Sequence, residues 1–347
     1  MSTYLYRLNF VGPLHLGLHG IGLEAVEERL GSDSLTSALI NGFAVLEGSR
    51  GVNELVEALL KSPPAFVLSS LFPFGPAPEN KSVPLEAVPR PLINPLLAKK
   101  DAVKEYGKDL KRLKYLRVDD LRSWISEVEE VDIEKLIQRS KTLTQDWWRE
   151  ELRPRVAIDR TTSNSSVWNQ AAIRFRREEK DSDGKVVAKA GLYGLIRFND
   201  ERWEGRVASA FRLLGEMGLG GERTYGLGLF QFDGFEPLLG AWRSFNSCPS
   251  KFHVLFSTYY PSEIERESLR ESLEAWEAKE RRGYIVSGRN TTTIKRKRVR
   301  MILEGSVTRK VLQGKMVDVT PDHASELGIS HRVYRSGLAF LVPGGGL

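Results

Sequence analysis

The sequence predicts a mixed α+β protein, and three observations lead to this fold class. Residues 3–11 alternate apolar and polar side chains, which is typical of a half-buried strand. Residues 35–46 and 206–217 instead place apolar side chains at helical spacing. Short segments of both kinds recur along the whole chain, so helices and strands are expected to share each unit of the fold.

The composition describes a globular chain. Its 347 residues suffice for two domains of ordinary size, and 41% of them are hydrophobic while 28% are charged. No apolar run approaches the roughly 20 residues of a membrane helix, so no membrane partner is expected. The single Cys248 excludes an intrachain disulfide and a zinc site built from several cysteines. With no signal-peptide pattern at the start, we expect a cytoplasmic protein.

The first two thirds of the chain carry six alternating elements. Ser32 is a plausible N-cap for the first helix. The elements are a strand at 3–11, a helix at 35–46, strands at 65–72 and 192–198, a helix at 202–217 and a strand at 227–235. Strand–helix–strand, repeated once, is the order of a ferredoxin-like (RRM-like) unit. We therefore predict such a domain over residues 1–236.

Two segments interrupt this predicted domain. Residues 73–95 are rich in proline and read as a stiff connector outside the core, and mixed-charge helical sequence follows up to 148. Together they form a helical insert at about 73–150. A β-hairpin is predicted at about 167–190, because strand-like residues 173–177 and 185–189 flank the turn signal Asp183-Gly184.

A second, shorter series follows residue 237. It comprises strands at 251–259, 284–287, 299–303 and 338–342, and a helix at 262–280 with Ser262 as its N-cap. We predict a smaller ferredoxin-like domain over residues 237–347. The glycines at 344–346 are expected to fray.

A glycine-rich loop at 218–228 is the most informative stretch for function. Five glycines, including Gly220 and Gly221, leave backbone N–H groups accessible, and Arg223, Thr224 and Tyr225 add a charge, a hydroxyl and a ring. The loop lacks the Gly-Lys-Ser/Thr ending of a nucleotide-triphosphate loop, and it follows a helix rather than a strand. An anionic ligand is one interpretation; a glycine C-cap with a tight turn is the other.

A basic segment lies further along the chain. Residues 279–300 contain nine basic residues and one acidic residue, including the run Lys295, Arg296, Lys297 and Arg298. Such a patch suits a polyphosphate like nucleic acid, although a solvated surface explains many charge runs.

The residues of ordinary enzyme sites do not assemble in this sequence. Five histidines are scattered, and His15 and His19 lie in a loop with no carboxylate at a familiar metal-binding spacing. Asp33 is explained by the helix dipole better than by catalysis. We predict no catalytic residue, no metal and no cofactor. His15 as the general base of a metal-free RNA cleavage stays open as an alternative.

Four segments occur in a characteristic order: 12–17 after the first strand, 32–39 opening the first helix, 155–162 before a hairpin, and the glycine-rich stretch 218–230. In order and spacing, over about two thirds of the chain, they resemble the RAMP superfamily of CRISPR effector proteins. More closely, they resemble the fourth subunit of the Csm (type III-A) complex, of the Cas-five group. The related type III-B subunit is an alternative.

This resemblance implies a non-catalytic subunit that grips the 5′ repeat-derived handle of the crRNA. It also implies a position between the large Cas-ten subunit and the third, backbone subunit of Csm, with the hairpin as a thumb against the duplex of guide and target RNA. The RNA-binding residues carried over are His15, Gly17, Arg155, Arg160, Thr161, Thr162 and the loop from Gly220 to Tyr225. Trp168 is a candidate stacking ring; the role of the 295–298 run rests on charge alone.

Two other functions remain possible from the sequence. A guide-processing endoribonuclease of the Cas-six type shares the double fold, but its glycine-rich loop is usually near the C-terminus, whereas more than a hundred residues follow this one. A protein–protein adaptor without RNA binding is the third interpretation.

Overall fold

The computed structural model describes the chain except for residues 1, 18–23, 178, 181–183, 185, 188, 249, 286–293, 327 and 344–347. His19, most of the predicted turn around Asp183 and the terminal glycines at 344–346 lie outside the described residues. Within the described part, no helix combines the length and the apolar character that crossing a membrane requires.

An antiparallel sheet organises the N-terminal part of the molecule, and the predicted α+β class is confirmed. Its first strand, β1 (Ser2–Phe10), lies between β10 (Gly191–Phe198) and β11 (Phe230–Phe232), and β2 (Phe66–Leu68) pairs with β10. The connecting helices are α1 (Ser32–Leu60) and, after the short turn η1 (Glu201–Trp203), α5 (Glu204–Met217). The order β1-α1-β2 and β10-α5-β11 is the predicted one. Helix α1 extends beyond the prediction, with a break at Gly48.

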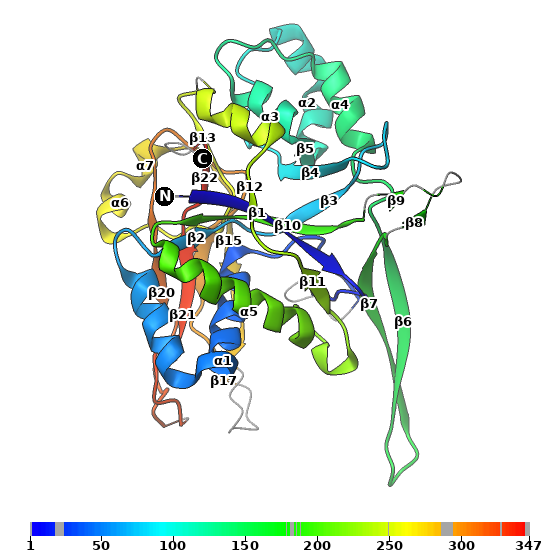
Figure 1. The fold of residues 1–347 in the computed structure, drawn as a ribbon, viewed down its shortest axis with the longest axis vertical. Helices are drawn as coiled ribbons and strands as arrows, with labels where there is room; N and C mark the ends of the chain where they lie inside the picture. Colours follow the sequence, from blue (N-terminus) through cyan, green and yellow to red (C-terminus); the bar gives the residue numbers. More distant parts are fainter. Residues whose placement is uncertain are drawn as a thin grey trace.

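Helices α1 and α5 lie together on one side of this sheet (Figure 1). The alternation along β1 explains this arrangement, because Tyr6, Leu8 and Phe10 share one face and are buried. The ring of Tyr6 lies 4.8 Å from that of Phe211 on α5. The glycine-rich loop follows α5 directly, so the packing of this helix fixes where the loop begins.

The proline-rich segment belongs to the sheet, and its prediction as a connector outside the core is wrong. It forms β3 (Phe72–Pro76) and β4 (Pro84–Pro89), which continue the sheet from β10 towards β5 (Tyr115–Arg117). Pro76, Pro84 and Pro89 are terminal residues of their strands, where a missing N–H interrupts little of the ladder. The predicted helical stretch follows as α2 (Lys100–Arg112), α3 (Val118–Ile125) and α4 (Ile133–Thr142).

A long β-hairpin projects beyond the body of the molecule (Figure 1). It consists of β6 (Trp148–Ile158) and β7 (Ser165–Phe175), and the turn between them is held by Asp159, whose carboxylate accepts the N–H groups of Thr161 and Thr162 at 2.8 Å. The predicted boundaries of about 167–190 are therefore wrong. Residues 173–175 pair with β6, and the Asp183-Gly184 signal marks only the two-residue strands β8 (Glu179–Lys180) and β9 (Val186–Val187).

The C-terminal part is mainly β-structure. A four-stranded sheet has the order β14 (Leu273–Ala275), β19 (Val307–Thr308), β13 (His253–Leu255), β22 (Leu341–Val342). Three ribbons accompany it: β15 (Ala278–Arg281) with β18 (Val299–Ile302), β16 (Tyr284–Ile285) with β17 (Ile294–Lys295), and β20 (Gly314–Asp318) with β21 (Tyr334–Leu338). The short segments η2 (Arg223–Tyr225), β12 (Glu236–Pro237) and η3 (Gly240–Ser247) lie between α5 and β13.

The predicted helix at 262–280 is wrong beyond residue 272. Ser262 is the N-cap of α6 (Glu263–Glu267), with Glu265 completing a capping box, and α7 (Leu269–Ser272) follows. The chain then becomes extended, because β14 and β15 pair with β19 and β18. Helices in the described part of 237–347 are thus short, and the division of the chain at 236/237 into two ferredoxin-like domains stays a prediction.

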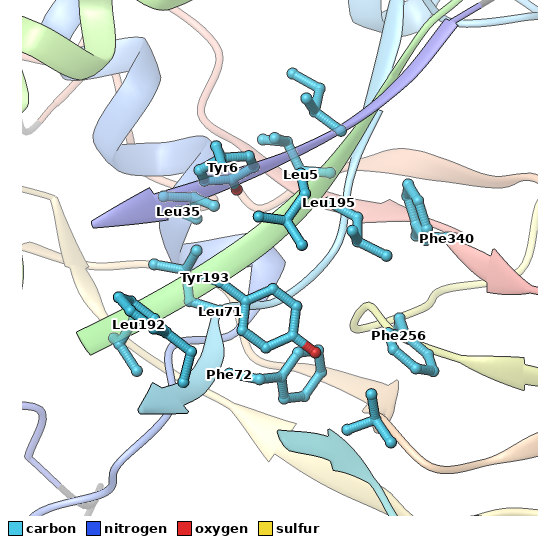
Figure 2. Packing of buried hydrophobic residues seen from close by; sticks show 14 of the residues in the cluster. Leu5, Tyr6, Leu35, Leu71, Phe72, Leu192, Tyr193, Leu195, Phe256 and Phe340 are labelled. Carbon is cyan, nitrogen blue, oxygen red and sulfur yellow. The ribbon is translucent and has the colours of Figure 1, made fainter. Parts of the chain in front are cut away.

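The two parts of the chain share one apolar core. Phe256 and Phe340, from the C-terminal part, belong to the same buried cluster as Phe72 and Tyr193 of the N-terminal sheet, and Phe256 lies next to Phe72 (Figure 2). The rings of Phe72 and Phe256 are 5.5 Å apart, edge to face. Such burial stabilises the junction, which orients the C-terminal ribbons relative to the glycine-rich loop.

A buried ion cluster reinforces the same junction. The carboxylate of Asp33, in the first turn of α1, is fully buried and accepts hydrogen bonds from Arg281 on β15 and Arg335 on β21. Burial alone would raise the pKa of Asp33, but the two guanidinium groups outweigh burial and hold that pKa below its ordinary value. Asp33 is therefore a charged structural link between the two parts of the chain.

We expect Asp33→Ala to lower the free energy of unfolding by about 3 kcal/mol or more, because it leaves two buried arginines without their counter-charge. Since the folded-state pKa of Asp33 is lowered, its contribution is complete above the unfolded-state pKa of about 4 and is lost as the pH falls below that value. Urea unfolding of both proteins at pH 7 and pH 3 measures this. A stability difference as large at pH 3 as at pH 7 would contradict it.

Candidate nucleic-acid interface

The glycine-rich loop turns back on itself after α5. Gly218 caps the helix with φ +81°, and its N–H donates to Leu214 O at 2.8 Å. Leu219 N–H then donates to Gly228 O at 2.9 Å, which closes the loop at its base. The C-cap interpretation is therefore correct for Gly218, while residues 220–226 extend beyond the cap. Arg223, Thr224 and Tyr225 lie exposed in this outer part, on the 3₁₀ turn η2.

The loop packs directly on the segment that follows β1. Gly221 N–H donates to His15 O at 2.9 Å, and Gly228 N–H donates to Pro13 O at 2.8 Å. A Cβ at Gly220, where φ is +85°, would collide with His15 O. Two segments that are separate in sequence therefore form one backbone-lined surface, and glycine is what permits their approach.

The side chain of His15 packs beneath this backbone surface, on the side that faces the protein interior. It is buried, with Nδ1 2.7 Å from Ala171 O on β7, and a β-bridge joins the adjacent Leu14 to Ile173. His15 thus connects the segment that follows β1 with the glycine-rich loop and the hairpin. Its imidazole fills a structural position, and Gly17 lies against it: a Cβ at Gly17 would approach His15 Nε2 to 3.0 Å.

A first cavity of about 780 Å³ lies between the glycine-rich loop and the hairpin. The hairpin contributes Arg155, Trp168 and Gln170, and the loop contributes residues 220–225. The guanidinium of Arg155 lies 4.7 Å from the ring centre of Tyr225, and its Nε donates to Gln170 Oε1 at 2.8 Å. The cavity therefore combines two cations, two aromatic rings and exposed backbone, which is a combination that suits single-stranded RNA.

The register of the hairpin determines which side chains enter this cavity. Arg155 is directly opposite Trp168, and Arg153 opposite Gln170, and cross-strand partners share one face of the ribbon. On the other face lie Val156, opposite Val167, together with Leu152 and Ile158. These four apolar side chains are 56–69% exposed. The hairpin thus has one polar and aromatic face and one exposed apolar face.

A second, smaller cavity of about 280 Å³ shares Gly220, Gly221 and Arg223 with the first. His15 and Gly17 line it, so these two predicted residues lie on this side of the loop. Its other wall comes from α1 and from the C-terminal strand β15. Glycine backbone therefore separates two open hollows, and Arg223 borders both.

The structure does not bring the other predicted residues to these cavities. Arg160, Thr161 and Thr162 lie in the hairpin turn, where the two threonine N–H groups bind Asp159, and they line neither cavity. Their role in binding the RNA handle therefore stays a prediction, and neither cavity supports it.

The basic run 295–298 also lies outside both cavities. Lys297 pairs with Asp322 at 2.6 Å, and Arg298 lies 3.9 Å from Glu280. Arg296 donates to Tyr284 O, and burial lowers its pKa. Three of the four side chains thus have a partner within the protein, and Lys295, Lys297 and Arg298 are exposed.

Gln170, Arg29, Lys279 and Arg281 line the cavities but were not assigned from the sequence. Gln170 follows from the hairpin register, which a correctly placed turn would have given. The other three depend on packing between distant segments. Within the described residues, no group of three or more histidine, cysteine or acidic side chains is arranged to hold a metal ion.

Comparison with known proteins bears on this geometry. Residues 249–344 match the family described as the CRISPR Csm4 C-terminal domain. A protein of Thermococcus onnurineus (strain NA1), named CRISPR system Cms protein Csm4, is 28% identical over 313 residues, which are 89% of each chain. The chain is thus similar to Csm4 proteins over most of its length, and its residues 249–344 match the C-terminal domain of that family. The resemblance predicted from the four segments is confirmed.

Solved structures agree in fold over the whole chain. The crystal structure titled Csm1-Csm4 cassette in complex with cA4 contains a chain that is 21% identical, with a TM-score of 0.57, and the match covers 100% of this chain and 98% of that one. A chain of the Csm3-Csm4 subcomplex of the type III-A CRISPR-Cas interference complex is 16% identical, with a TM-score of 0.58 and 99% of both chains covered. At these identities the matches show that the chain shares the fold of those chains.

The backbone contact at Gly220 should be essential to the loop. We expect Gly220→Ala to destabilise the protein by about 2 kcal/mol more than Gly226→Ala, because both glycines have positive φ but only the Cβ at Gly220 meets an atom, His15 O. Thermal unfolding of the two variants measures the difference. Equal melting temperatures would show that the loop moves freely away from His15.

Proposed function

We propose that this protein is the Csm4 subunit of a type III-A CRISPR effector complex and that it holds the 5′ handle of the crRNA. The observation that carries the proposal is the first cavity, in which the glycine-rich loop faces Arg155 and Trp168 of the hairpin. Backbone N–H groups and Arg223 suit the phosphates of the handle, and the rings suit its bases. A type III-B complex is the alternative setting.

We propose two protein partners, the large Cas-ten subunit and the backbone subunit of Csm. The support is that proteins similar to this chain have been crystallised in a Csm1-Csm4 cassette and in a Csm3-Csm4 subcomplex. A bridging position between those subunits follows from binding both. The division of the chain into ferredoxin-like domains at 1–236 and 237–347 belongs to the same proposal.

The thumb that would lie against the duplex of guide and target RNA is the β6–β7 hairpin, in place of residues 167–190. Its exposed apolar face, formed by Leu152, Val156, Ile158 and Val167, supports such a contact, because apolar patches on a protein surface mark interaction sites. Its opposite face lines the handle cavity. One element would thereby connect handle binding with target pairing.

We further propose that the protein does not cleave RNA. The endoribonuclease alternative requires His15 as a general base, and the geometry disfavours it: the side chain is 4% exposed and its Nδ1 faces Ala171 O. A general base must reach the 2′-hydroxyl that it deprotonates. The Cas-six reading and the pure protein adaptor are therefore the less favoured functions.

Arg223→Glu should weaken binding of handle RNA by about tenfold or more without changing the melting temperature, because it replaces an exposed cation that borders both cavities by an anion. Filter binding at fixed salt measures the affinity. Arg212→Glu is the matched control, since Arg212 is exposed on α5 and lines neither cavity. Equal affinities for the two variants would remove the loop from the RNA site, and binding independent of salt would favour the adaptor.

Repeat RNA incubated with the purified protein in EDTA should remain intact, because His15, the candidate base, is buried with its Nδ1 facing Ala171 O. A denaturing gel of end-labelled RNA shows the outcome. Cleavage that disappears in His15→Ala would instead establish the endoribonuclease.

A further inference from the structure

The second cavity lies between the two parts of the chain, and its wall is strongly basic. Among the described residues that line it are Arg29, Arg223, Lys279 and Arg281, and only one of those residues, Glu27, is acidic. The cavity is open on the far side of Gly220 and Gly221 from the first one. Such a concentration of cations beside bare backbone favours a phosphate-bearing ligand.

The cations are positioned by contacts within the protein. Arg281 is held by two hydrogen bonds to Asp33, at 2.5 and 3.0 Å, and its side chain is 12% exposed. Lys279, two residues earlier on β15, lies 3.4 Å from Glu27 and is 41% exposed. Arg29 lies 3.8 Å from the buried carboxylate of Glu304. Of these three side chains, that of Lys279 is the most exposed, and its ion pair with Glu27 is partly exposed as well.

An RNA strand that occupied both cavities would have to cross the glycine backbone between them. Gly220 and Gly221 have no side chain that would obstruct an RNA strand running between the two cavities. Gly17, which lines the second cavity beside His15, likewise has no side chain that would fill it. Arg223 stands at the crossing. A single strand that leaves the rings of Tyr225 and Trp168 can therefore continue over the loop towards β15.

We propose that the second cavity binds backbone phosphates of the same RNA strand, with Lys279 and Arg281 as binding residues from the C-terminal part and Asp33 as the residue that positions Arg281. This inference rests on the proposed function, since it extends the RNA path from the first cavity. It assigns to residues 279–281 the phosphate contact that the sequence suggested for the basic stretch 279–300. The run 295–298 lies outside that path.

The experiment compares two oligoribonucleotides, a trinucleotide and a decanucleotide of uridine, by fluorescence anisotropy. We expect Lys279→Ala to weaken binding of the decanucleotide about fivefold and to reduce the slope of log K against log salt by about 0.7, as for one lost phosphate contact. The trinucleotide, which fills the first cavity alone, should bind Lys279→Ala as it binds the wild-type protein. Lys310→Ala is the matched control: Lys310 also has an exposed pair, with Glu271 at 3.8 Å, and lines neither cavity.

A second variant separates phosphate binding from a structural role of the ion pair. Glu27→Gln breaks the contact with Lys279 but keeps the lysine and removes the one acidic residue of the wall. We expect it to tighten decanucleotide binding about twofold to fivefold, whereas a purely structural pair would make both variants bind more weakly. Weaker binding by Glu27→Gln, or equal behaviour of Lys279→Ala and Lys310→Ala with both oligonucleotides, would overturn this inference. If the wild-type protein binds neither oligonucleotide, the proposed function itself fails.

Discussion

The contact between the backbone of Gly220–Gly221 and His15 is the constraint on which the site depends. The carbonyl of His15 accepts the N–H of Gly221, and its imidazole reaches Ala171 on the hairpin. His15 thereby holds together three segments that are far apart in the sequence: the segment after β1, the glycine-rich loop and the hairpin. Both cavities border this loop, whose base is closed by the hydrogen bond from Leu219 N–H to Gly228 O and whose outer turn is exposed.

The same contact explains why the two interpretations of the glycines do not compete. Gly218 and Gly228 serve the chain itself, as a helix cap and as a point where a Cβ would collide with Leu219 O. Gly226 has positive φ, and a Cβ added there would meet no described atom within 4 Å, so the space beside its Cα is open. The glycines at the base of the loop are therefore required by the fold, whereas the outer turn of the loop is exposed.

Much of the N-terminal fold followed from local pattern. The alternation in residues 3–11 and the helical spacing after Ser32 survive in the structure because each element has one face to bury. The failures came where pairing with distant residues decided the conformation. Residues 273–281 have helical spacing but form strands against β19 and β18, and this leaves Trp276 58% exposed.

The site could be predicted from the sequence where its residues are neighbours along the chain. Residues 220–225 were found because glycine and the Arg-Thr-Tyr sequence are adjacent in the chain. The hairpin was misplaced because its turn is made by an Asp159 side chain instead of a glycine, and the strong Asp183-Gly184 signal drew the prediction away. The basic stretch 279–300 was visible in the sequence, but its pattern did not show that Arg281 is placed beside the second cavity by the buried Asp33.

The hairpin register connects these observations with the proposed assembly. Because side chains alternate across a strand, placing Arg155, Trp168 and Gln170 in the cavity necessarily turns Val156 and Val167 outward. An exposed apolar ribbon is unfavourable for an isolated protein, since such surfaces promote association. It becomes favourable when a base pair or a neighbouring subunit covers it. The polar face and the apolar face of the hairpin are therefore two consequences of one register, and a shift of one residue would exchange them and abolish both contacts.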